Sequence, residues 1–337
     1  MDNHLELYRE DELIYYNNGR WVYPLFDLEN YIIKNDLSVD TLFLKDKIAG
    51  RAAAHLMVYI GIKKVHIGLI SRVGLEVFKK NSVNITYDTL VDRIKCRTET
   101  LLEGVENSKE AYKILKQRAG LFSGIEISCK SLTCGYQRDV VLDKIDLNIK
   151  EGGTLLFLGE NGEGKSTFLR TIANLQDKIS GEVVFYKKGE QIKVKKGDIG
   201  FLNQNPDTRK MPILVREIMD VTASLLGLKG EEKKYQIEIS LRRTGALKFL
   251  DKHYYELSGG EKQRVNLARL ICQRAGIFIL DEPAANLDKK GRDILVSLLK
   301  DIHDREMPTI IVSSHNKEFI DDLGWEKLYV KGGNIGA

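Results

Sequence analysis

The stretch of nine residues from Gly159 to Thr167, GENGEGKST, constrains the fold of this chain more than any other. An apolar run at residues 154–158 precedes it, and residues with helical spacing follow from Phe168. Glycines let successive backbone N–H groups converge on an anion, and a helix start adds the positive end of its dipole. This order of strand, glycine turn and helix predicts a phosphate-binding loop, whereas the alternative is a chance glycine-rich turn.

The residue types inside this stretch suit a nucleotide bound with a divalent cation. A lysine at position 165 can reach the β- and γ-phosphates, and the hydroxyl of Ser166 can ligate Mg²⁺. The candidate nucleotide-binding residues of the loop are Gly159, Glu160, Asn161, Gly162, Glu163, Gly164, Lys165, Ser166 and Thr167.

Length and composition indicate how many domains the chain has and which classes of protein are excluded. The 337 residues suggest two domains, each large enough to bury its own core. The net charge of +4 comes without a basic stripe, so we expect no nucleic-acid partner. The longest uncharged apolar run, residues 52–62, has 11 residues, and about 20 are needed to span a bilayer.

Targeting signals and cysteine usage indicate the compartment. The N-terminus does not resemble a signal peptide. The chain has four cysteines, Cys96, Cys129, Cys134 and Cys272. No two of them are spaced as C-x-x-C. We therefore expect a reduced, cytoplasmic chain.

The first 120 residues alternate between strand and helix patterns. Strands are expected at residues 5–8, 13–16, 41–44, 65–70 and 83–87. Helices are expected at residues 24–33, 48–60 and 73–80. This order indicates a small α/β sandwich. A helix at 108–118, followed by a glycine-containing segment, predicts a connector ending in a hinge. The expected division is 1–105 for the first domain, 106–124 for the connector and 125–337 for the second domain.

The first domain resembles an uncharacterised bacterial family that shares the cytidine-deaminase-like fold. The likeness lies in PLFDL at residues 24–28, KDKIAGRAAA at 45–54 and the strand-helix-strand at 64–87. Active deaminases in that fold hold zinc with H-x-E and P-C-x-x-C at two helix starts. The corresponding starts, near Pro24 and Gly50, offer no His or Cys. The resemblance therefore implies a domain that senses a small ligand or binds a partner, without zinc-dependent deamination.

A few residues of this domain invite a functional interpretation. Asp27, Lys47 and Arg51 either line a pocket or are solvated surface charges. His55 lies in an apolar helix, where a core histidine with its hydrogen bonds satisfied is the simpler interpretation. Cys96, between two basic residues, has either a lowered pKa or the behaviour of an ordinary thiol.

In the second domain, LSGGEKQR at residues 257–264 is the decisive stretch. A serine and two glycine amides at the start of a helix, expected over 262–274, make a second anion site. The stretch resembles the LSGGQ signature of ABC-type ATPases, and the matching residues are Leu257, Ser258, Gly259, Gly260 and Glu261. Glu261 replaces the usual glutamine. In that family the second site closes on the γ-phosphate of ATP held by another subunit.

The resemblance covers residues 125–335 and assigns roles to further residues. An apolar strand at 276–280 ends in Asp281 and Glu282. The resemblance implies that Asp281 holds Mg²⁺ through water and that Glu282 acts as general base for the hydrolytic water. His315, after a strand at 309–312, matches the switch histidine that contacts the γ-phosphate.

Three more positions complete the pattern. Tyr136 matches the aromatic residue that stacks on adenine. Gln204 matches the Q-loop glutamine that touches Mg²⁺ and the attacking water. Asp288 matches the D-loop, which communicates across the dimer.

The implied fold is a P-loop NTPase of ABC type, with a mixed sheet core, an antiparallel β layer and a helical subdomain. The expected strands are 125–129, 141–149, 154–158, 181–186, 192–194 and 199–202, and the last three fit the antiparallel layer. Helices at 215–226 and 233–250 fill a transporter-sized helical subdomain. Only 22 residues follow His315, so we expect no further C-terminal regulatory domain.

The motifs together favour ATP binding and hydrolysis with Mg²⁺ by a head-to-tail dimer, either a homodimer or a pair with another ABC ATPase. A P-loop kinase or GTPase would explain Lys165 and Asp281, but not LSGGE together with His315. The primary interpretation is the energising subunit of a transporter, which docks on a separate permease at the inner face of the cell membrane. Residues 135–136 and 211–218 look most like importers of metal ions or metal chelates. The alternative is a soluble ABC ATPase that serves as regulator or assembly factor, with the first domain as ligand sensor.

Overall fold

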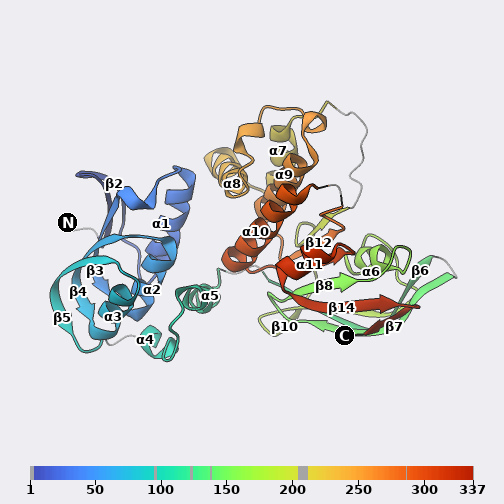
Figure 1. Ribbon diagram of the computed structural model, residues 1–337, viewed down its shortest axis with the longest axis horizontal. Coiled ribbons are helices and arrows are strands. Elements are labelled where there is room, and N and C mark those ends of the chain that lie inside the picture. Colours follow the sequence, from blue (N-terminus) through green and yellow to red (C-terminus); the bar gives the residue numbers. More distant parts are fainter. Residues whose placement is uncertain are drawn as a thin grey trace. The chain divides into compact units, whose positions relative to one another are not determined.

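The structure is a computed structural model that describes residues 4–94, 97–121, 124–136, 139–203, 212–285 and 287–336. The chain divides into two compact units, Met1–Leu121 and Phe122–Ala337, whose elements are labelled in Figure 1. Among the described residues, no helix combines the length and the apolar character that crossing a bilayer requires.

The first unit is built on one mixed sheet with the strand order β2-β1-β3-β4-β5. Its strands are β1 (Leu5–Arg9), β2 (Glu12–Asn17), β3 (Leu42–Ala49), β4 (Lys64–Ser71) and β5 (Asn84–Val91). β1 runs antiparallel to β2 and β3, while β3, β4 and β5 are parallel. Its helices are α1 (Tyr23–Lys34), α2 (Arg51–Ile60), α3 (Arg72–Lys80), α4 (Arg97–Leu101) and α5 (Ser108–Arg118), with a 3₁₀ turn η1 at Val39–Thr41.

The strand β3 is longer than its sequence predicts. Residues 48 and 49 were expected to begin a helix, but Ile48 and Ala49 pair with Leu69 and Ile70 of β4. The helix α2 begins only at Arg51, after Gly50 in extended conformation. Pairing with β4 therefore decides the conformation of these two residues, although their spacing is typical of a helix. The end of β3 comes directly before the start of α2.

The helix α5, expected as a connector, lies in the core of the first unit. The side chain of Tyr112 is 1% exposed, and its ring stacks on that of Tyr59 with 4.1 Å between centroids. Its hydroxyl donates a hydrogen bond to Glu29 Oε2 at 2.8 Å. An amphipathic helix with such an anchor packs as an element of the unit, and the division between the units falls after it. The expected hinge includes residues 122 and 123, which lie outside the described residues.

The second unit contains two sheets. The larger has the order β11-β12-β13-β8-β14-β15 and the smaller the order β10-β9-β6-β7. The larger sheet consists of β8 (Thr154–Leu158), β11 (Ile199–Leu202), β12 (Ile277–Asp281), β13 (Thr309–Ser314), β14 (Glu326–Lys331) and β15 (Asn334–Gly336). The smaller consists of β6 (Glu126–Tyr136), β7 (Asp139–Ile149), β9 (Ser180–Lys187) and β10 (Glu190–Ile192).

One strand belongs to the other sheet than expected. The sequence predicts residues 199–202 in the antiparallel layer, but β11 pairs in parallel with β12. The reason is its burial, since Gly200 and Leu202 are buried and Ile199 and Phe201 are half-buried. A strand covered on both faces is typical of a parallel sheet with layers on each side.

Helices and packing complete the second unit. Its helices are α6 (Lys165–Ile172), α7 (Val215–Ser224), α8 (Gly230–Arg243), α9 (Gly259–Cys272), α10 (Lys289–Glu306) and α11 (Lys317–Leu323), with 3₁₀ turns η2 (Leu247–Phe249) and η3 (Tyr254–Glu256). Figure 1 shows α7, α8 and α9 grouped apart from the sheets. Successive side chains of β8 pack on opposite faces of the sheet, so Phe157 lies in one hydrophobic cluster and Leu156 lies in the other. The Phe157 ring stacks on Phe168 of α6 at 4.8 Å, which anchors that helix on the sheet.

Candidate functional site

The site is assembled at one edge of the larger sheet. β8, β12 and β13 are adjacent and parallel, with Ser313 paired to both Asp281 and Phe157, and Ser314 paired to Leu158. Their carboxyl ends therefore meet at the same edge, which is where ligands bind in open α/β sheets. The glycine loop, the two strand-end carboxylates and His315 all follow these three strand ends.

The glycine loop forms a cradle around the Lys165 ammonium. Lys165 Nζ donates hydrogen bonds to the carbonyl oxygens of Gly159 and Glu160, both at 2.8 Å. Gly164 caps α6 with φ +95°, and a Cβ there would lie 2.5 Å from Val141 Cγ1. Only glycine fits this position, so the turn that aims the loop N–H groups depends on it.

Lys165, Glu282 and His315 form a continuous polar cluster. Glu282 Oε1 lies 3.9 Å from Lys165 Nζ and 2.8 Å from His315 Nδ1. The side chains of Lys165 and Glu282 are 6% and 5% exposed, whereas that of His315 is 51% exposed. The carboxylate is thus held from two sides in a largely dry site, where electrostatic interactions are stronger than in water.

The backbone of Glu282 is strained, and Ser313 holds it. Glu282 has φ +48°, a left-handed conformation that a non-glycine residue adopts at a cost of about 1 kcal/mol or more. Its N–H donates to Ser313 O at 3.2 Å and to Ser313 Oγ at 3.0 Å. The hydroxyl of Ser313 in turn donates to Asp281 Oδ1 at 2.6 Å. One buried serine thus orients both acidic residues.

Sequence reasoning missed this role of Ser313. The available signal was a polar residue directly after an apolar strand and two positions before His315. Strand pairing, which brings Ser313 beside Asp281, could not be read from the sequence.

Asp281 fits a metal ion. Its Oδ1 accepts from Ser313, while its Oδ2 is buried and has no hydrogen-bond partner among the described residues. A buried carboxylate oxygen without a partner is costly unless a cation or water meets it. The donor chemistry suits Mg²⁺, with the Ser166 hydroxyl at the start of α6 as the second predicted ligand. Gln204, predicted for the same ion, lies outside the described residues.

Tyr136 ends β6 beside the start of α6. Its side chain is 52% exposed, and its hydroxyl lies 3.4 Å from Thr167 Oγ1. An exposed aromatic face next to a phosphate cradle is free to stack on a heterocyclic base.

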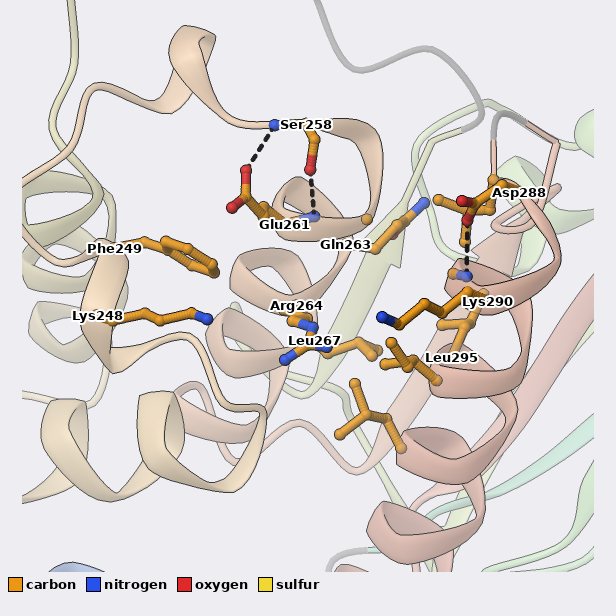
Figure 2. Close-up of a pocket in the computed structure, with 15 residues that line it drawn as sticks. Lys248, Phe249, Ser258, Glu261, Gln263, Arg264, Leu267, Asp288, Lys290 and Leu295 are labelled. Carbon is orange, nitrogen blue, oxygen red and sulfur yellow. Dashed lines mark hydrogen bonds between the residues drawn. The ribbon is translucent and has the colours of Figure 1, made fainter.

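The second predicted anion site lies at the start of α9, shown in Figure 2. Ser258 caps the helix, and its N–H donates to Glu261 Oε2 at 2.8 Å while Glu261 N–H donates to Ser258 Oγ at 3.4 Å. The hydrogen bond from the Ser258 backbone lowers the pKa of Glu261. A carboxylate in the first turn also complements the helix dipole. This capping box explains how glutamate takes the place of glutamine here, while Ser258 and Gly259 remain exposed.

Asp288 lies close to that site and caps α10. Its carboxylate accepts a hydrogen bond from the Gly291 N–H at 2.8 Å, as Figure 2 shows. Asp288 therefore fixes the turn that precedes α10. The residue at position 286, within the same motif, lies outside the described residues.

The candidate residues of the first unit do not form one site. Asp27 is exposed and accepts a hydrogen bond from Asn17, and Arg51 donates to the Leu102 carbonyl at 2.8 Å. Lys47 lines a separate cavity. His55 is buried with Nδ1 at 3.0 Å from Ser108 Oγ, and burial lowers its pKa to about 4, so its ring is neutral at pH 7. Cys96 lies outside the described residues.

Two families match this chain. Residues 142–285 match the family described as ABC transporter, and residues 7–119 match the family described as domain of unknown function (DUF1893). The energy-coupling factor transporter ATP-binding protein EcfA1 of Streptococcus pyogenes is 31% identical over 217 residues, which are 62% of this chain and 77% of that protein.

Solved structures give the same picture of the second unit. The structure of cbiO1 from Clostridium perfringens, described as part of the ABC transporter complex cbiONQ, has a TM-score of 0.56 at 27% identity and covers 63% of this chain and 86% of its own. The ATP-binding cassette MJ0796, in a dimeric post-hydrolysis state with ADP and Pi, has a TM-score of 0.53 at 25% identity and covers 63% and 97%. The second unit thus has the α/β P-loop fold of these cassettes.

Proposed function

The chain belongs to the ATP-binding proteins of ABC transporters and is an ATPase that uses ATP with Mg²⁺, and from this premise we propose that it acts as a head-to-tail dimer. The main support is that one copy carries two anion sites on separate parts of the second unit, the cradle around Lys165 and the exposed start of α9 at Ser258. A single γ-phosphate would be held by the cradle of one copy and by Ser258 of the other. The cassette MJ0796 is itself described as dimeric.

We propose the following division of labour within one site. The Lys165 ammonium exchanges its two carbonyl partners for phosphate oxygens, and Tyr136 stacks on the adenine. Asp281 and Ser166, with Gln204, hold Mg²⁺, which neutralises phosphate charge. Glu282 accepts the proton of the attacking water, and His315 keeps its carboxylate in place. The short distances from Glu282 to both Lys165 and His315 are the observation that carries this assignment.

Two substitutions test this assignment. Glu282→Gln keeps the shape of the side chain but removes its basicity, so ATP is expected to bind while turnover stalls and a dimer accumulates on gel filtration. Lys165→Ala is expected to lose ATP binding or hydrolysis, because the phosphate charge loses its partner. Wild-type turnover from the Glu282→Gln protein would refute the general-base role.

We propose further that the chain energises a separate membrane permease and works at the inner face of the cell membrane. Support comes from the relatives, since EcfA1 is named as a transporter ATP-binding protein and cbiO1 as part of a transporter complex. Import of metal ions or metal chelates is the subclass we favour. Purification of the tagged chain from detergent-solubilised membranes is expected to bring down a protein with several membrane spans.

A second candidate is a soluble ATPase that serves as a regulator or assembly factor, with the first unit as its sensor. The observation that favours it is the additional unit at residues 7–119, which matches a family of its own. We propose that this unit has the deaminase-like fold that its sequence resembles, which its five-stranded mixed sheet supports. Recovery of only soluble partners in the same purification would favour this candidate over transport.

A further inference from the structure

The first unit contains a cavity of about 310 Å³ where the starts of α1 and α2 meet the end of β3 and the start of β1. Its walls are mainly apolar, formed by residues such as Trp21, Pro24, Leu25, Ala52 and Ala53. The volume lies at the lower end of the range for small-molecule sites, about 300–1,000 Å³. The cavity is therefore large enough for a small metabolite.

A carboxyl group lies among these apolar walls. Leu42, Leu44 and Asp46 alternate along β3, so Asp46 continues the side of the strand that faces the core. Burial raises the pKa of Asp46 to about 7, although the backbone N–H groups of Ile48 and Lys47 donate to it. Within the described residues Asp46 has no ion-pair partner. A carboxylate kept in such a place without a cation is typical of a binding site.

The mouth of the cavity carries the opposite charge. Arg20 and Lys47 line it, and both side chains are exposed. Arg20 forms no ion pair within the part of the chain that the structure describes. The exposed Arg20 guanidinium thus adds a positive charge to a lining that also holds the Asp46 carboxylate, which suits a ligand that carries both charges.

The start of α2 supplies hydrogen-bond donors to the same space. Gly50 caps this helix of ten residues with no side-chain hydrogen bond. The first N–H groups of a helix have no acceptor inside it, and two of the residues that carry them here, Ala52 and Ala53, line the cavity. Asp46 lines the same cavity, so one small ligand in it can meet both a negative group and these donors.

We propose that this cavity binds a free α-amino acid with an apolar side chain. Its ammonium group donates to Asp46, its carboxylate accepts from the start of α2 and from Arg20, and its side chain lies against Trp21 and Leu25. An α-amino acid is the simplest molecule that joins both charges on one carbon atom to an apolar body. If the first unit is a sensor, as proposed above, an apolar amino acid is the ligand that it senses. Binding of this ligand can be tested without measuring ATP turnover.

The full chain provides its own probe. Its two tryptophans are Trp21, at the cavity wall, and Trp325 in the second unit. In a Trp325→Phe background, each of the proteinogenic amino acids is added singly, and Trp21 fluorescence and the melting temperature are recorded. At least one apolar amino acid is expected to change both, whereas acetate alone and methylammonium alone change neither. No response to any amino acid, or an equal response to acetate or methylammonium, would overturn the proposal.

Matched variants separate binding from folding. Asp46→Asn removes the charge of this half-buried carboxylate and is expected to fold, yet to weaken binding about ten-fold or more, because a charge-assisted hydrogen bond is lost. Arg20→Gln at the mouth is expected to weaken binding less. Asp27→Asn is the control, since Asp27 lies on α1, is exposed and does not line the cavity. Unchanged affinity in a folded Asp46→Asn protein would contradict the proposal.

Discussion

Substituting Asp46 by asparagine should stabilise the protein at neutral pH, and the gain should depend on pH in a defined way. Burial raises the pKa of this carboxyl from 3.8 to about 7. Between pH 3.8 and about pH 7, the Asp46 carboxyl therefore keeps its proton in the folded chain but has released it in the unfolded chain. Stability from this group is fully present below about pH 4 and is lost as the pH rises through about 7.

The magnitude follows from the two pKa values. Their difference of about three corresponds to about 4 kcal/mol at most. Part of Asp46 remains accessible to solvent, so we expect about half of this, ~2 kcal/mol, at pH 8. The asparagine side chain of the Asp46→Asn variant is neutral at every pH and can still accept from the two N–H groups. The side chains of His4, Arg20 and Lys47, which line the same cavity, are common to both proteins.

Urea unfolding of the full chain measures this difference. In the Trp325→Phe background, Trp21 fluorescence reports on the first unit. The free energy of unfolding of the Asp46→Asn variant minus that of its parent should be close to zero at or below about pH 4 and should rise to ~2 kcal/mol by about pH 8. A difference that is constant across this range, or a variant that is less stable at pH 8, would mean that folding does not raise the pKa of Asp46.

Three further substitutions test the second unit. Ser313→Ala should keep ATP binding but lower turnover about ten-fold or more, because Glu282 and its neighbour lose the hydroxyl that orients them; equal turnover in a phosphate-release assay would remove this role. Gly164→Ala should abolish ATP binding in an equilibrium titration, because the φ of +95° is strained for alanine and the side chain of Val141 on β7 occupies the space of its Cβ. Retained binding would mean that the loop adapts. Glu261→Gln should keep turnover and lower stability by about 0.5 kcal/mol, through the lost charge at the helix start; a melting temperature equal to that of the wild type would argue against a stabilising charge there.

Most of the site in the second unit could be predicted because its residues lie in short, contiguous motifs. The glycine loop, the strand before it and the helix after it are contiguous in the sequence, so their order alone predicts the cradle around Lys165. Asp281 and Glu282 end a short, wholly apolar run, which is typical of a buried parallel strand. The expected bounds of β8 and β11 also agree with the structure.

Features that depend on strand pairing could not be predicted. The role of Ser313 requires the register between β12 and β13, and the sheet of β11 is decided by its neighbour β12. Asp46 escaped notice because the sequence favoured a helix from residue 48, whereas pairing with β4 extends β3 to Ala49. Only this longer strand places Asp46 in line with Leu42 and Leu44.

If one phosphate is held by two copies of the chain, the glycine loop of one copy lies close to the start of α9 of the other, and a covalent link between these two positions shows it. One copy carries Asn161→Cys in the glycine loop, and a second, larger tagged copy carries Gly259→Cys at the start of α9. Both positions are exposed, and both copies carry Glu282→Gln to prevent turnover. With Mg²⁺ and ATP, a short thiol crosslinker should produce the covalent heterodimer on a denaturing gel, and without nucleotide it should not. A heterodimer band that is absent with ATP, or equally strong without it, would contradict the head-to-tail dimer.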